Sequence, residues 1–174
     1  MRTVWLLFWD ICCLRQGPER VPTQLAFVAL IVFAYLLLAL AGNSFAPDGQ
    51  SSVAWSVMLL ATLMLLLFCY VVLKFKGLTQ RFVATVTALF GVEVVLGVML
   101  LPFMALLRSP WSVSEFALCG YLMLMGWELA VRGFIFHRAF NVSLLLGSVM
   151  ALTLFLLTTW LNIQLFPQLL TKAA

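Results

Sequence analysis

The sequence predicts an all-α integral membrane helical bundle with five transmembrane helices and an N-terminal interfacial amphipathic helix. The 174 residues are 65% hydrophobic and only 9% charged, whereas soluble domains are about half apolar and about one quarter charged. The chain also contains five long apolar runs, each near the ~20 residues that a helix needs to cross a bilayer. The loops between these runs are too short to form a second, soluble domain.

Residues 1–22 predict an interfacial helix followed by a Gly-Pro linker. The first fourteen residues are too few to span a bilayer. Asp10 breaks the apolar run and Arg15 follows it, so we expect no signal-peptide cleavage. A loosely attached N-terminal extension is the alternative. On a helical wheel one face is apolar, and it comprises Val4, Leu7, Phe8, Ile11 and Leu14.

Residues 23–174 predict the transmembrane domain. Turn residues separate its apolar runs, as in GNSFAPDGQSS and RSPWS, and KFKGLTQR and HRAFN form the other connections. Pro102 interrupts the third run near its end, and Pro167 ends the fifth. An odd number of spans without an internal repeat argues against a duplicated transporter architecture. The predicted spans are 24–41, 53–73, 82–107, 113–136 and 142–166.

The distribution of basic residues predicts the orientation of the chain in its membrane. With the N-terminus cytoplasmic and the C-terminus on the outer side, only Arg108 and Lys172 lie on the outer side. The other eight Lys and Arg residues are then cytoplasmic: Arg2, Arg15, Arg20, Lys74, Lys76, Arg81, Arg132 and Arg138. No basic cluster carries the interleaved aromatic residues of a nucleic-acid site, so we expect no nucleic-acid partner.

The sequence offers no recognisable catalytic or metal-binding motif. His137 is the only histidine, and the four cysteines form no CxxC pair. The chain contains no GxSxG, HExxH, P-loop or GxGxxG pattern. We therefore expect no enzyme activity, no metal and no cofactor.

Three charged residues within the spans predict a buried polar cluster: Glu93, Glu128 and Arg132. Glu93 lies about 18 Å beyond Arg81 along a helix, near the middle of a hydrocarbon layer about 30 Å thick. Glu128 and Arg132 are four residues apart and share a helical face. Because the third and fourth spans should be antiparallel neighbours, Glu93 and Glu128 are expected at similar depths. Thr87 and Tyr121 are weaker candidates to join them.

Two interpretations of this cluster stay open. A charged carboxylate at the centre of a bilayer costs about 3 kcal/mol, so such residues mark functional sites by default. A proton or ion relay is one interpretation. A satisfied ion pair that fixes the register of the helices is the other.

The fifth span carries small and polar residues on one face, which comprises Ser143, Gly147, Ala151, Thr158 and Asn162. Small residues four apart let helices approach closely. This face predicts either packing within the chain or docking of another membrane protein. At the end of the fourth span, His137 and Arg138 are expected at the membrane boundary, in contact with lipid headgroups.

Two segments, DICCLRQGPERVP and WELAVRGFIFHRAF, together with five spans, resemble a group of short proteobacterial inner-membrane proteins. Those proteins are similar in topology to the Yip1 superfamily, whose members have a cytoplasmic N-terminus and five spans. The chain lacks their long cytoplasmic N-terminal domain, so binding of small GTPases is not carried over. The resemblance implies a membrane-embedded adaptor rather than an enzyme.

These observations lead to two expectations for function. The first is a non-catalytic scaffold or accessory subunit, which contacts the lipid bilayer and either another membrane protein or a second copy of itself in a homo-oligomer. The alternative is a small permease or proton-coupled transport component that uses Glu93, Glu128 and Arg132.

Overall fold

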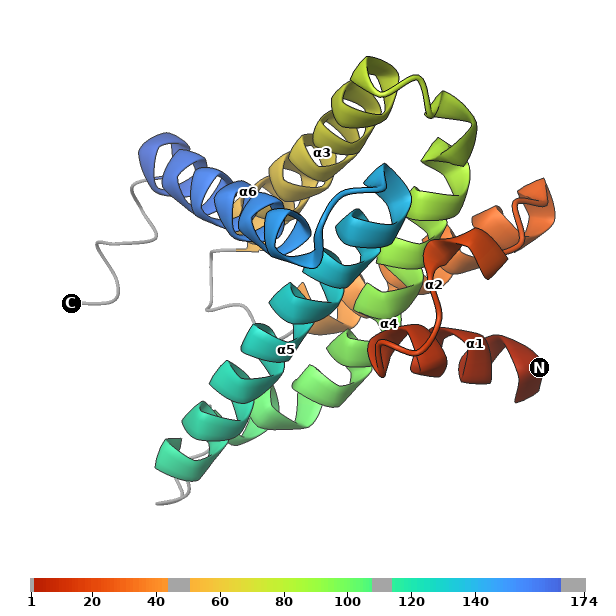
Figure 1. Ribbon diagram of the computed structural model, residues 1–174. Coiled ribbons are helices and arrows are strands. Elements are labelled where there is room, and N and C mark those ends of the chain that lie inside the picture. Colours follow the sequence, from red (N-terminus) through yellow and green to blue (C-terminus); the bar gives the residue numbers. More distant parts are fainter. Residues whose placement is uncertain (1, 44–50, 108–113, 167–174) are drawn as a thin grey trace.

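The computed structural model describes residues 2–43, 51–107 and 114–166. Within these ranges the chain forms helices and no strands, which confirms the all-α prediction. Five helices are long and apolar enough to cross a membrane, so the chain is a multi-pass membrane protein. The helices are α1 (Arg2–Cys12), α2 (Leu25–Asn43), α3 (Ser51–Phe75), α4 (Phe82–Leu107), α5 (Ser114–Phe140) and α6 (Leu144–Leu165) (Figure 1).

Helix α4 lies at the centre of the bundle, with α2, α5 and α1 packed around it (Figure 1). Its residues from Thr85 to Val92 are all buried. By contrast, Ile31 is the only buried residue of α2, and large apolar side chains such as Leu37 and Leu63 are exposed. Exposed apolar side chains are expected where a helix faces lipid rather than water.

Helix α5 continues to Phe140, beyond the predicted end of the fourth span at 136. Ala139 and Phe140 are buried in the apolar core, which keeps this last turn helical. The helix ends where Asn141 adopts a positive φ of 51°, a conformation that asparagine tolerates better than most residues. Ser143 then caps α6, since its side chain accepts a hydrogen bond from the Leu146 amide.

Helix α1 packs on α4 through the apolar face that the sequence predicts. Phe8 and Ile11 are buried, and a side chain at Gly91 of α4 would collide with the Phe8 ring. The Trp127 Nε1 of α5 donates a hydrogen bond to the Cys12 carbonyl oxygen at 3.1 Å. The apolar face therefore contacts protein, and it is the other side, with Trp5 and Trp9, that is exposed. This arrangement disagrees with a loosely attached extension.

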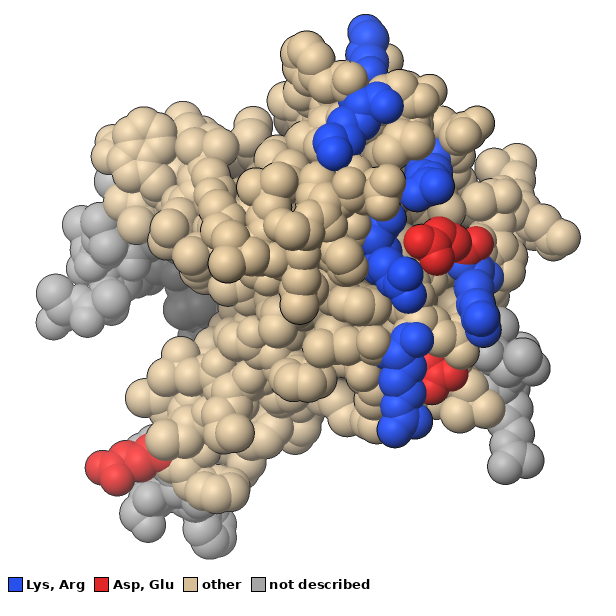
Figure 2. Space-filling view, in the orientation of Figure 1, with Lys and Arg blue, Asp and Glu red and all other residues tan. Residues whose placement is uncertain are grey.

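Lys and Arg side chains gather in a band along one side of the molecule (Figure 2). The segment Pro18–Arg20 packs against both α4 and α5. Pro18 and Arg81 line one cavity together with Ala139. The N-terminal linker, the α3–α4 connection and the end of α5 thus lie together, and we call this the basic end of the bundle.

Candidate functional site

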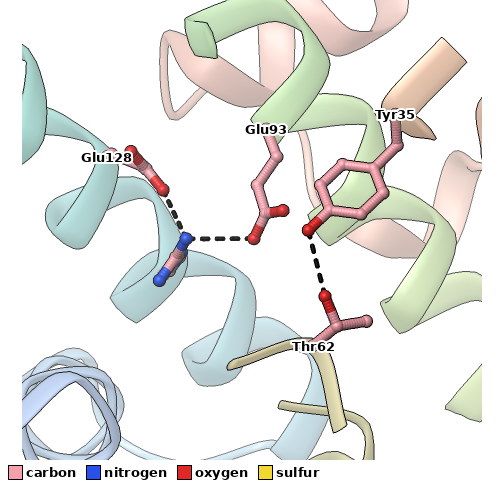
Figure 3. A network of polar contacts seen from close by, with 5 residues as sticks. Tyr35, Thr62, Glu93 and Glu128 are labelled. Atoms are coloured by element: carbon pink, nitrogen blue, oxygen red, sulfur yellow. Dashed lines mark hydrogen bonds and ion pairs between the residues drawn. The ribbon is translucent and has the colours of Figure 1, made fainter. Parts of the chain in front are cut away.

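Three charged side chains meet inside the bundle. The Arg132 Nη2 donates to Glu93 Oε1 at 3.0 Å and forms a second ion pair with Glu128 Oε1 (Figure 3). The side chains are mostly buried, with exposed fractions of 24% for Arg132, 13% for Glu93 and 12% for Glu128. The structure therefore brings together the three residues of the predicted cluster.

The positions of these three residues along their helices explain why their side chains lie together. Glu128 and Arg132 lie one turn apart on α5, so their side chains share a face. Glu93 comes from the middle of α4, which packs along α5. The guanidinium is planar and carries five N–H donors, so a single Arg132 can serve carboxylates on two helices.

The charged cluster borders a cavity of about 250 Å³ that all five spanning helices line. On the α2–α3 side, the Tyr35 hydroxyl and the Thr62 Oγ1 are hydrogen-bonded at 3.0 Å (Figure 3). The polar lining residues are Tyr35, Thr62, Glu93, Glu128, Arg132, Thr158, Thr159 and Asn162. The apolar ones are Met58, Ala61, Leu65, Met125, Leu154 and Phe155.

Two buried polar atoms of the lining residues have no hydrogen-bond partner in the described part of the chain. They are Arg132 Nε and Asn162 Oδ1. A buried donor or acceptor that is left unpaired costs about 1–3 kcal/mol. The polar groups of Arg132 and Asn162 are therefore not fully satisfied by the described part of the chain.

The two ends of the cavity differ. Toward the basic end, α5 continues with Phe136 and Phe140, one and two turns beyond Arg132, and their rings contact each other and Phe68. Away from the basic end, a neighbouring cavity of about 270 Å³ between α2 and α3 shares Tyr35 and Met58. Aromatic side chains thus lie on the basic-end side of Arg132, and a second cavity adjoins the site toward the opposite end.

The predicted face of α6 divides into two parts. A Cβ atom at Gly147 would lie 2.5 Å from the Gly133 carbonyl oxygen and 2.8 Å from the His137 amide nitrogen, and Ala151 is buried. Ser143 caps its own helix. These residues serve packing within the chain, so Gly147 and Ala151 are not available to another protein. Further along, Thr158 and Asn162 line the cavity instead.

The two residues expected at lipid headgroups have different surroundings. The His137 Nδ1 is hydrogen-bonded to the Val142 carbonyl oxygen, so the ring belongs to the α5–α6 turn. Arg138 is exposed at the basic end, and its guanidinium lies 5.8 Å from the centre of the Phe134 ring.

Some residues of the cavity were not predicted from the sequence, among them Tyr35, Thr62 and Thr159. Each is a hydroxyl residue in an apolar run, and a helix that is apolar all round does not show from its sequence which face turns inward. Thr87, a weaker candidate, instead donates to the Val83 carbonyl oxygen of its own helix. Tyr121, the other weaker candidate, is not among the lining residues.

The described ranges contain no group of three or more His, Cys, Asp or Glu side chains that could hold a metal ion. The fold and the site together define a class: an α-helical multi-pass membrane protein with a charged, polar cavity among its spans. Comparison of the chain with protein-family models, with curated proteins and with solved structures gave no match. The resemblance to the Yip1 superfamily therefore stays a prediction.

Proposed function

We propose that this protein is a small permease or proton-coupled transport component that binds its solute or proton beside Glu93, Glu128 and Arg132. The observation that carries the proposal is the cavity, because every spanning helix contributes to it and it contains all three charged residues. Solute sites of membrane transporters lie near the middle of the bilayer between helices. Ionisable residues within spans are a mark of such pathways.

A purely structural ion pair explains less of the arrangement. One carboxylate would suffice to neutralise Arg132, yet two contact it. A structural role also gives no reason for a cavity with hydroxyl and amide groups on the opposite wall. In a packed core, such polar atoms would normally be paired. The cavity therefore favours the binding of a solute or proton as the role of the cluster, rather than the fixing of the helix register.

The proposal includes an orientation. We place the N-terminus and the basic end in the cytoplasm and the C-terminus in the periplasm of a bacterial inner membrane. The uneven distribution of Lys and Arg in the sequence supports this, as does their band on one side of the bundle (Figure 2). The neighbouring cavity between α2 and α3 would then lie on the periplasmic side of the site, and the aromatic residues would lie on its cytoplasmic side.

The test is reconstitution of the full chain into proteoliposomes with an internal pH dye. Under an imposed gradient we expect flux above that of empty liposomes, and we expect Glu93→Gln to abolish it. Glu115→Gln is the matched control, because Glu115 is an exposed acid at the start of α5. If the wild-type chain and Glu93→Gln give equal flux, the proposal is wrong.

A scaffold role is the second candidate, and a different feature favours it. Helices α4 and α5 border an apolar groove of about 630 Å³ lined by Met99, Pro102, Phe103, Gly120, Met123, Leu124 and Trp127. Met123 is 76% exposed in this groove, so an apolar helix of a membrane partner could pack against it. A scaffold should co-purify in mild detergent with a stoichiometric partner and lose it in Met123→Ala. Reconstituted alone, it should carry no flux.

A further inference from the structure

We infer that the cavity beside Glu93, Glu128 and Arg132 accepts a small organic cation with a primary ammonium group and a short apolar body. The inference rests on the proposed function and deepens it, because it names the chemical class of the solute. Three properties of the cavity carry it: its charge, its size and the chemistry of its walls.

The charge of the site favours a monovalent cation. Two carboxylates face one guanidinium, and the other lining residues are uncharged. With all three groups ionised the site carries one net negative charge, which a low-dielectric interior strongly disfavours. One added positive charge balances it. An anion would meet two carboxylates and only one guanidinium, which both carboxylates already bind.

The size of the cavity favours a molecule over a bare ion. A volume of about 250 Å³ equals roughly eight water molecules at about 30 Å³ each. A proton needs no such space. Mg²⁺ and Ca²⁺ need six or more oxygen ligands at short range and Zn²⁺ usually takes four N, S or O ligands. No group of three acidic, His or Cys side chains is placed to bind a metal in the described ranges.

The lining residues of the cavity suit a ligand with a charged head and an apolar body. Arg132 contacts one oxygen of each carboxylate, and a carboxylate has about four acceptor positions, so acceptors remain for ammonium N–H donors. The residue Asn162 also lines the cavity. The apolar body would lie against Met58, Met125 and Phe155. Phe155 and Tyr35 add aromatic rings, which attract cations.

The experiment is titration calorimetry on the purified full chain in detergent with three probes of equal length: butylammonium, butanol and butyrate. We expect saturable binding of butylammonium at one site per chain and none of the other two. Glu93→Gln should weaken butylammonium binding at least tenfold, whereas Glu115→Gln should leave it unchanged. Binding of butyrate or butanol as tight as that of butylammonium would overturn the inference, as would unchanged affinity in Glu93→Gln.

A second variant keeps the test decisive if Glu93→Gln does not fold. Glu128→Gln removes the charge of the other carboxylate and leaves the Arg132–Glu93 ion pair in place, so we expect it to weaken butylammonium binding several-fold. Unchanged affinity in this variant overturns the inference. If no probe binds but Glu93-dependent proton flux persists, the cation inference is wrong and the proposed function stands. Absence of both binding and flux overturns both.

Discussion

Arg132 Nη2 lies 3.0 Å from Glu93 Oε1 and so joins α5 to α4 across 39 positions of the sequence. The same nitrogen also contacts Glu128 on its own helix. This single guanidinium therefore pairs with a carboxylate on each of the two helices. Its removal leaves two partly buried carboxylates without a counterion, and removal of either carboxylate leaves an ion pair behind.

The first prediction follows from this asymmetry. Arg132→Met should lower the free energy of unfolding by about 3–5 kcal/mol, because breaking a buried pair leaves uncompensated charge. Glu93→Gln should lower the free energy of unfolding by only about 1 kcal/mol. In this variant Glu128 still pairs with Arg132, and the amide oxygen of the new side chain still accepts a hydrogen bond. Unfolding in detergent, followed by circular dichroism, measures both. The triple variant Glu93→Gln, Glu128→Gln, Arg132→Met should recover most of the stability lost in Arg132→Met.

The second prediction concerns the packing of α5 on α6. Gly147→Leu should destabilise the chain by more than the 1–3 kcal/mol typical of overpacking, because its Cβ alone would lie 2.5 Å from the Gly133 carbonyl oxygen. Gly126→Leu on α5 is the matched control, since a Cβ there meets no atom within 4 Å. The measurement is the midpoint of thermal unfolding of the two variants. Equal midpoints for Gly147→Leu and Gly126→Leu would contradict the packing described for α6.

The third prediction concerns the attachment of α1. Phe8→Ala should release α1 from α4, because the buried Phe8 ring covers Gly91 and deletion of a buried aromatic costs about 3–5 kcal/mol. Limited trypsin digestion at Arg15 and Arg20 should then become faster. Leu6→Ala serves as the control, since Leu6 is 50% exposed on the opposite side of the helix. Equal digestion of Phe8→Ala and wild type would show that α1 does not depend on this contact.

The fourth prediction concerns thiol chemistry at the end of α1. Burial, together with the neighbouring Cys13, raises the pKa of the Cys12 thiol to about 12. At pH 8 only about one Cys12 in 10,000 would then be a thiolate, the form that reacts with maleimide. We expect Cys13, which is partly exposed, to be labelled first, as read by mass spectrometry of the N-terminal peptide. Faster labelling of Cys12 would contradict its burial.

The same shift in pKa has a consequence for stability. The folded chain keeps Cys12 neutral up to a pKa of about 12, whereas the unfolded thiol ionises near 9.0. The unfolded state therefore binds fewer protons above pH 9, and stability falls as the pH rises from there. Cys12→Ala should flatten this fall when thermal midpoints are compared between pH 8 and pH 10. An equally steep fall in the variant would mean that other groups cause it.

The presence of five membrane-crossing helices follows from the amino-acid sequence. Apolar length alone dictates this, because the backbone in lipid must satisfy its own hydrogen bonds. The sequence also determined the meeting of Glu93, Glu128 and Arg132. Helical spacing and a short loop are enough to place α4 beside α5 in antiparallel register.

The surroundings of that cluster, by contrast, follow from the way the helices pack on one another. A membrane helix is apolar on all sides, as in α2, so its sequence does not say which face turns inward. The inward rotation of α2 and α3 brings Tyr35 and Thr62 to the cavity. The crossing of α6 over α5 assigns Gly147 to packing and Asn162 to the site. Such rotations depend on how side chains from several helices fit together, and pairs of residues along one helix do not encode them.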